Sequence, residues 1–289
     1  MKKSNLLILA VIALFVTLQS CKRDNDTPLD TGTTSARDNG AAENLFADIK
    51  RVVEEAADDE GQSAKYAGDK SGAYSFGSCA TVTINPAWVD TTWPKVMEID
   101  FGTTNCTGSY GIKRRGKLVV TLTDRYRNAG SILTIQPQNY FVNDVKVEGT
   151  KTITNMGLNA NNNLEFDVDV VNGKITYTDN STITWASNRT NEWIEGDSTT
   201  FFSHGLAGVC DDVYLITGSA NGLDRNGLSY TVNITSPLRK EICCRWLVSG
   251  KLELSPNGKA TRYVDFGAGD CDNKATVTIN GNTYIVPMF

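Results

Sequence analysis

The amino-acid sequence predicts a mainly β protein: an antiparallel meander that forms a sandwich or a curled, half-open barrel, with one N-terminal amphipathic helix. Three observations support this fold class. From Ala80 onward apolar and polar residues alternate, as they do in strands that bury one face. Asn-Gly pairs interrupt the alternating runs, and Asn-Gly favours the tight turn of a β-hairpin. No long helical pattern separates the runs, which argues against parallel βαβ architectures.

The alternating runs belong to a β domain that we place at residues 76–289. Examples of these runs are Thr81–Ile84, Lys117–Leu122, Leu164–Val170 and Leu228–Ile234. The domain also contains internal repeats: residues 143–195 match residues 211–255 in an ordered series of short motifs. Such self-similarity is typical of a chain built from related structural units, so we expect a long meander of related hairpins.

A helix is predicted over residues 42–57, where apolar residues recur at helical spacing and charged residues occupy the other side. The recurring residues are Leu45, Ile49, Val52, Val53 and Ala56. Asn39 is the predicted N-cap. We expect the apolar side to pack on the sheet; a helix that binds a partner is the alternative. The polar flanks predict a flexible tether over residues 21–41 and a linker over residues 58–75.

Six cysteines lie in the predicted β domain, and the hairpin pattern indicates how they pair. Paired residues of an antiparallel hairpin lie at equal distances from the turn centre. Cys79 and Cys106 are equidistant from a predicted turn at Thr92-Trp93. In the same way, Cys210 and Cys243 are equidistant from Asn226-Gly227, and Cys244 and Cys271 from Asn257-Gly258. We therefore predict these three pairs as disulfides: Cys79–Cys106, Cys210–Cys243 and Cys244–Cys271. Buried free thiols are the alternative.

The first residues have the pattern of an export signal. Met1-Lys2-Lys3 is positively charged, and the apolar run Leu6–Leu18 is shorter than the about 20 residues of a membrane span. It leads into Leu18-Gln19-Ser20-Cys21, which resembles the lipobox of bacterial lipoproteins. That resemblance implies a signal peptide over residues 1–20, cleavage before Cys21, and acylation of Cys21 as a membrane anchor. An ordinary secretory signal followed by an incidental cysteine is the alternative.

The resemblance also sets an expected location. The remainder of the chain is similar in style to uncharacterised β-rich lipoproteins of Gram-negative bacteria, which implies the outer membrane or the cell surface. The formal net charge of −5 argues against nucleic acid as a partner, because binding phosphates requires clustered cations. His204 is the only histidine, and the cysteines form no zinc-ligand pattern, so we expect no metal and no cofactor. Trp88 and Trp93, in a predicted loop with Pro86 and Pro94, are candidate exposed contacts for a ligand.

These features lead to three hypotheses about function. The first is a non-enzymatic envelope or surface protein that binds an unknown protein or glycan through sheet edges and loops. The second is a glycan- or peptide-directed hydrolase, which requires two facing carboxylates about 5–9 Å apart. The third is a carrier of a lipophilic ligand, with a curved sheet holding the ligand under the helix, which requires a large apolar cavity.

Overall fold

A computed structural model describes residues 30–63, 76, 79–108, 111–205 and 207–288 of the chain. Residues Gly32–Phe289 form one compact unit. Its helices are α1 (Thr34–Ser63), α2 (Phe201–His204) and α3 (Ala207–Cys210). Its strands are β1 (Thr81–Asn85), β2 (Lys95–Asp100), β3 (Cys106–Thr107), β4 (Lys113–Leu122), β5 (Ile132–Val142), β6 (Val145–Leu158), β7 (Leu164–Thr176), β8 (Thr182–Glu195), β9 (Val213–Leu223), β10 (Ser229–Glu241), β11 (Ser249–Pro256), β12 (Arg262–Ala268), β13 (Lys274–Ile279) and β14 (Asn282–Pro287).

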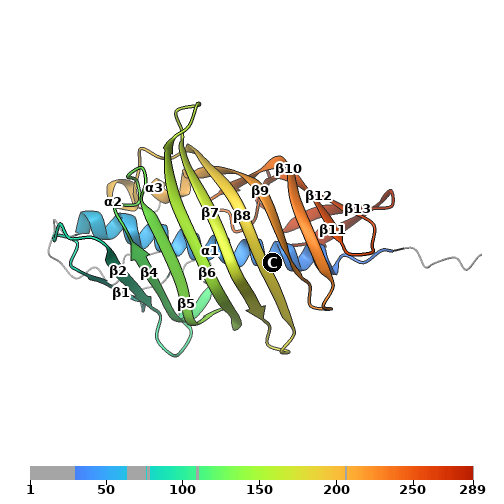
Figure 1. Ribbon diagram of the computed structural model, residues 1–289, viewed down its shortest axis with the longest axis horizontal. Helices are drawn as coiled ribbons and strands as arrows, with labels where there is room; N and C mark the ends of the chain where they lie inside the picture. Colours follow the sequence, from blue (N-terminus) through green and yellow to red (C-terminus); the bar gives the residue numbers. More distant parts are fainter. Residues whose placement is uncertain (1–29, 64–75, 77–78, 109–110, 206, 289) are drawn as a thin grey trace, which may run out of the picture. The chain divides into compact units, whose positions relative to one another are not determined.

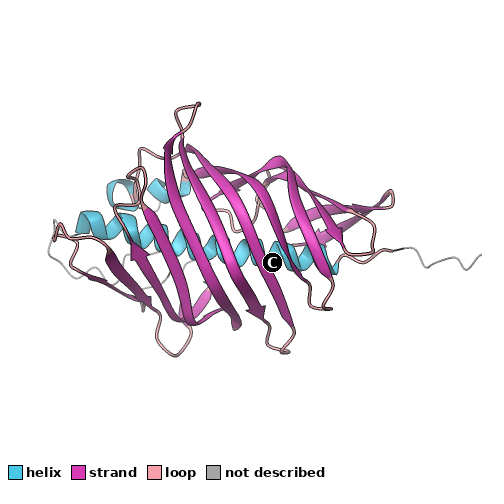
Figure 2. Cartoon of the chain, viewed as in Figure 1, coloured by secondary structure: helices cyan, strands magenta, loops and turns pink. Residues whose placement is uncertain are grey.

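The described strands form one antiparallel sheet of 14 strands, in which neighbours follow the order of the chain (Figure 1). Only β3 lies off this path, where it pairs with β4. Among the described strands β1 and β14 are the two edges, so the sheet is not closed. The predicted fold class is therefore confirmed: a mainly β antiparallel meander with one long N-terminal helix (Figure 2). The two ranges that repeat in the sequence each contain three successive strands, β6 to β8 and β9 to β11.

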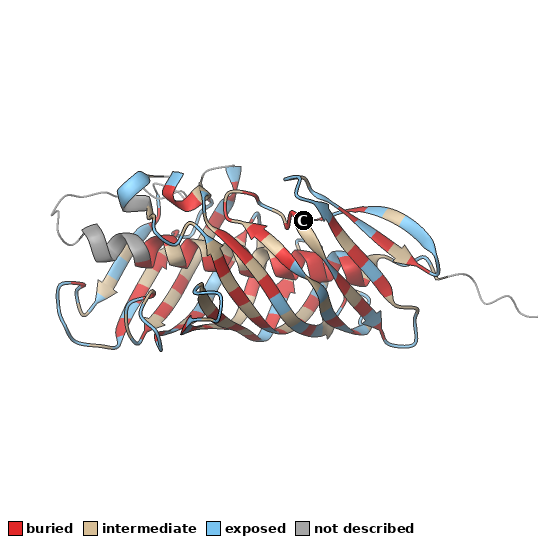
Figure 3. Cartoon of the chain, turned by 90° about the horizontal axis from the view of Figure 1, so that it is seen from above, coloured by how far each residue is buried: buried red, intermediate tan, exposed pale blue. Residues whose placement is uncertain are grey.

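Helix α1 runs across the strands and is buried on nearly all sides (Figures 1 and 3). Between residues 34 and 57, Arg37 is the only exposed residue. Phe46, Ile49 and Val53 on the helix are buried in the same hydrophobic cluster as the inward-facing side chains of the strands. Because a flat sheet can cover only one side of a helix, this burial shows that the sheet curls around α1.

The helix is longer than predicted, so the predicted end of the tether at residue 41 and the predicted start of the linker at residue 58 are wrong. It begins at Thr34 and not at Ala42, and it continues to Ser63. Residues 21–29 of the predicted tether and 64–75 of the predicted linker lie outside the described residues. Asn39 is not the N-cap, because this residue lies within the helix. Its side-chain oxygen accepts a hydrogen bond from Trp185 Nε1 (3.0 Å). The added first turns carry polar residues that face the sheet; Ser35 Oγ, for example, donates to Asp224 (2.6 Å). A search for apolar periodicity does not detect such turns.

Glycine bulges interrupt several strands where the sheet bends. The β4–β5 register shifts at Gly116, which has a φ of +86° and would place a Cβ 1.9 Å from the carbonyl oxygen of Asn139. The β6–β7 register shifts at Gly149, where φ is +129° and a Cβ would lie 2.8 Å from the Cα of Gly173. Only glycine allows this conformation together with this close approach. Bulges bend and twist a strand, which is consistent with a sheet that wraps a helix.

All three predicted disulfides are present, with Cα–Cα distances of 5.8, 4.8 and 5.7 Å in chain order. The predicted turn centres are less accurate. In the β9–β10 hairpin Asp224 N donates to the carbonyl of Leu228, so the centre lies at residue 226 and not between residues 226 and 227. The later disulfides lie beyond the paired parts of their strands, where a small offset is tolerated.

Within the described part of the chain, no helix has the length and apolar character needed to cross a bilayer.

Candidate ligand-binding cleft

A cleft of about 610 Å³ lies beside α1, between the β5–β6 turn and the segment that joins β10 to β11. Six separate parts of the chain line it: α1, Ile112 just before β4, the β5–β6 hairpin, the β7–β8 loop, the β10–β11 segment, and Cys271 in the β12–β13 loop. The lining residues are Ala41, Asn44, Leu45, Ala47, Asp48, Arg51, Ile112, Val142, Asn143, Val145, Tyr177, Lys240, Ile242, Cys243, Cys244, Arg245, Trp246 and Cys271. Its volume is in the range of small-molecule binding sites.

The walls of the cleft are mainly apolar. Leu45 from α1 lies on one side, and Val142 and Val145 from the β5–β6 hairpin line another. The β10–β11 segment contributes Ile242 and Trp246. An apolar surface of this kind favours an apolar ligand, because burying it releases ordered water.

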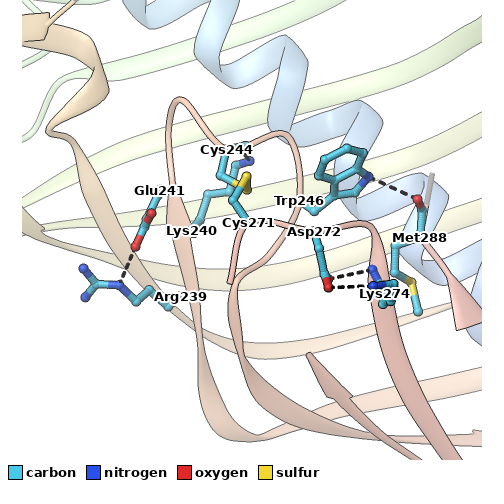
Figure 4. Close-up of a disulfide and its surroundings, with 9 residues drawn as sticks. All are labelled: Arg239, Lys240, Glu241, Cys244, Trp246, Cys271, Asp272, Lys274 and Met288. Atoms are coloured by element: carbon cyan, nitrogen blue, oxygen red, sulfur yellow. Dashed lines mark hydrogen bonds and ion pairs between the residues drawn. A yellow bond between two sulfur atoms is a disulfide. The ribbon is translucent and has the colours of Figure 1, made fainter. Parts of the chain in front are cut away.

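Covalent and hydrogen bonds hold the β10–β11 segment in place (Figure 4). The Cys244–Cys271 disulfide ties it to the loop between β12 and β13. Trp246 Nε1 donates to the backbone carbonyl of Met288 (3.1 Å), which orients the indole ring. Lys240 Nζ donates to the carbonyl of Cys244. The wall formed by this segment is therefore set by the fold before any ligand binds.

Two cations, Arg245 and Lys240, line the cleft on the side of β10 and the β10–β11 segment. Arg245 is exposed, and its guanidinium carbon lies 5.8 Å from the centre of the Trp246 ring. Among the described residues no carboxylate forms an ion pair with it. Lys240 is buried, and burial together with the charge of Arg51 lowers its pKa to about 7. The cleft thus combines apolar walls with a cation that is available to an acidic group.

Asp48 forms the other charged part of the cleft, on the side of α1. Its carboxylate accepts hydrogen bonds from the Nε of the fully buried Arg114 (3.0 Å) and from Arg51 (3.0 Å). Burial opposes ionisation of Asp48, but the charges of Arg114 and Arg51 prevail and lower its pKa to about 2. The carboxylate is therefore ionised and already paired at neutral pH, which leaves it poorly suited to act as a general acid.

The sequence-predicted contact residues lie elsewhere. Trp88 is only 7% exposed and packs edge to face on Trp93, with 5.6 Å between ring centres. Trp93 is partly buried, and Lys95 lies beneath it and donates to the carbonyls of Ala87 (2.9 Å) and Asp90 (2.9 Å). The prediction that Trp88 is an exposed ligand contact is therefore wrong, because Trp88 is buried and packs against Trp93 of the same loop. Cys21 lies outside the described residues.

A carboxylate with an unusual environment lies in a second, smaller cavity of about 30 Å³ near α2 and α3. Burial and the nearby charge of Glu54 raise the pKa of Asp212 in this cavity to about 8. Trp193 Nε1 also lines the cavity and has no hydrogen-bond partner there. Such a volume admits a water molecule but not a sugar ring.

Among the described residues no group of three acidic, cysteine or histidine side chains is arranged to hold a metal ion.

Comparison with family models, curated proteins and solved structures gave no match for this chain. The cleft therefore has to be interpreted from its own residues. Sequence reasoning missed it because its lining comes from six segments that only the fold brings together. One signal could have indicated it: Cys243 and Cys244 are followed directly by Arg245 and Trp246, which places a cation and an indole beside a disulfide.

Proposed function

We propose that this protein is a lipid-anchored envelope protein that binds a lipophilic ligand in the cleft beside α1, without catalysing a reaction. The cleft of about 610 Å³ with its apolar walls is the observation that supports the proposal. Of the three hypotheses drawn from the sequence, only the carrier requires such a cavity. The tryptophans that would support glycan contact are packed against each other, and the most perturbed carboxylate lies in a cavity that is too small for a glycan.

The cleft also suggests the form of the ligand. An acyl chain or a comparable apolar group fits against Leu45, Val145 and Ile242. An acidic group at one end of the ligand would lie near Arg245, which has no carboxylate partner among the described residues. Pairing a cation at the mouth of an apolar site favours amphipathic anions over neutral lipids.

Ligand binding can be tested with residues 32–289, which include the whole compact unit. We expect this chain to bind the fluorescent fatty acid cis-parinaric acid, and we expect Val145→Arg to weaken binding at least tenfold by filling the cleft. Met156→Arg is the matched control, because Met156 lies on the same strand, is 54% exposed and does not line the cleft. Thermal unfolding of both variants would show that they remain folded. Absence of binding, or equal binding by Val145→Arg and the wild type, would refute the proposed function.

The anchor is tested separately in cells. Metabolic labelling with a palmitate analogue should mark the full-length chain and should be lost in Cys21→Ser. A Cys79→Ser variant serves as the control, because Cys79 forms a disulfide and should not affect labelling at residue 21. Persistent labelling of Cys21→Ser would contradict lipid anchoring and would leave the ligand-binding result unaffected.

A further inference from the structure

A third cavity, of about 40 Å³, lies between α1 and the middle of the sheet; we call it the inner chamber. Four cationic side chains line it: Lys50, Lys151, Arg189 and Lys240. Among the described residues that line it, Glu43 is the only one with an acidic side chain. Burying charge away from water is costly unless the charge is paired, so this excess of cations requires an explanation.

Among the described residues, only two of the four cations have a carboxylate partner. Arg189 Nη2 is paired with Glu43 (2.8 Å), and Lys50 is paired with Glu54. Lys151 Nζ instead donates to the carbonyl of Phe46 (3.0 Å), and Lys240 Nζ donates to the carbonyl of Cys244. Neither of these lysines forms an ion pair with a carboxylate among the described residues.

The inner chamber also contains hydrogen-bond donors that have no partner. Within the part of the chain that the structure describes, Arg189 Nη1 and Ser187 Oγ have no hydrogen-bond partner, although their residues are only 3% and 8% exposed. Asn191 is 5% exposed, and its side-chain oxygen likewise has no partner; its amide can be rotated to present the NH₂ group. Leaving a buried donor unpaired costs about 1–3 kcal/mol, so such donors indicate a missing acceptor.

We propose that the inner chamber binds one small monovalent anion, either a halide or a carboxylate group. An anion would be a counter-ion for Lys151 and Lys240 and an acceptor for Arg189 Nη1 and Ser187 Oγ. The chamber exceeds the roughly 10–15 Å³ that one water-sized guest needs, and it is too small for a large anion. Lys240 and Ile242 line both the inner chamber and the cleft, so the acid group of a cleft ligand is one source of the carboxylate. This last point rests on the proposed function.

Bromide is the probe for a free anion. Crystals of residues 32–289 grown in sodium bromide should show an anomalous peak within reach of Arg189 Nη1 and Ser187 Oγ. In solution, chloride and bromide should raise the melting temperature in a saturable way relative to gluconate at equal ionic strength. We expect Ser187→Ala to weaken the apparent halide affinity about tenfold, the loss typical of one charged hydrogen bond. Lys259→Met, at an exposed turn, is the control and should leave the affinity unchanged.

Each outcome decides the proposal. Water alone in the inner chamber, or halide effects that are equal in the wild type and Ser187→Ala, would overturn it. Lys151→Met provides a second test, because the halide-dependent increment should shrink whatever the variant does to absolute stability. If palmitic acid displaces bromide, the natural source is the carboxylate of the cleft ligand; if both bind together, the source is a free halide. Bromide binding without any fatty-acid binding would sustain this proposal while refuting the proposed function.

Discussion

Replacing Lys151 by methionine should stabilise the protein at neutral pH and reduce the pH dependence of its stability. Lys151 lies on β6, is 5% exposed and donates only to the carbonyl of Phe46 (3.0 Å). Burial and the neighbouring charge of Lys50 lower its pKa from 10.5 to about 7. Between these two pH values Lys151 binds more protons in the unfolded chain than in the folded chain, so its contribution makes stability rise with pH.

The size of the effect follows from the two pKa values. Each pKa unit corresponds to about 1.4 kcal/mol, so keeping Lys151 buried costs about 4 kcal/mol at pH 7 and about 2 kcal/mol at pH 9. Methionine removes this cost and keeps a flexible side chain of similar length. It also loses the hydrogen bond to Phe46, which costs about 1 kcal/mol. The variant should therefore gain about 3 kcal/mol at pH 7 and about 1 kcal/mol at pH 9.

Urea unfolding of residues 32–289 from pH 6.5 to 9 measures this directly, in a buffer without halides so that no added anion pairs with the lysine. Lys240, whose pKa is also lowered to about 7, contributes a similar slope. Asp212, whose pKa is raised to about 8, opposes both lysines below pH 8, so the comparison is made from pH 8 to 9, where the variant should keep about half of the wild-type pH dependence. Lys259→Met, at an exposed position, should follow the wild type. If Lys151→Met kept the full wild-type slope, or were less stable at pH 7, the reasoning about a poorly solvated lysine would be refuted.

Three further predictions concern Asp48, Asp212 and the Cys244–Cys271 disulfide. Asp48→Asn should lower the free energy of unfolding at pH 7 by about 3–5 kcal/mol, because Arg114 is left buried without its partner. As the pH falls from 4 to 2, protonation of Asp48 should lower the free energy of unfolding of the wild type by about 2 kcal/mol. Urea unfolding over this pH range should show a smaller loss in the variant. Asp212→Asn should abolish a fall in wild-type stability of about 1.4 kcal/mol per pH unit between pH 4.5 and 7, since the raised pKa of Asp212 makes the folded state hold a proton there; equal slopes would contradict this. Replacing Cys244 and Cys271 together by serine should cost about 3–4 kcal/mol in chemical unfolding, given a separation of 27 residues, and should weaken fatty-acid binding because a cleft wall is released.

The sheet could be predicted from the sequence because its information is local. Period-two alternation and Asn-Gly turns specify strands and hairpins one at a time, and an antiparallel meander needs nothing more than neighbours that pair in order. The disulfides followed from the same logic, since a hairpin sets which residues lie opposite each other. The predicted turn centre of the β9–β10 hairpin was slightly off because Leu223 pairs with Ser229, so the loop between them has an odd number of residues and centres on Asn226.

The extent of the helix, the cleft and the inner chamber could not be predicted in this way. The charged side of α1 would be expected to face water, yet Glu43 and Lys50 are buried against polar side chains of the sheet. The sequence carries no periodic signal for such contacts, because the partners lie far apart in the chain. Glu43 and Arg189, for example, are separated by more than 100 residues. The same reasoning applies to Trp88: whether a loop tryptophan is exposed depends on what the loop folds against.

The buried charges on α1 specify its position more than they stabilise it. Asp38, Glu43 and Asp48 pair with arginines from the β9–β10 turn, from β8 and from β4. A buried ion pair contributes little net stability, but breaking one is costly. Moving α1 by one residue along the sheet would rotate its side chains by about 100° and separate all three pairs at once. Apolar contacts alone would tolerate such a shift far better, because apolar attraction is not directional. Since α1 forms a wall of both the cleft and the inner chamber, the ion pairs that hold the helix in register also determine the shape of both cavities.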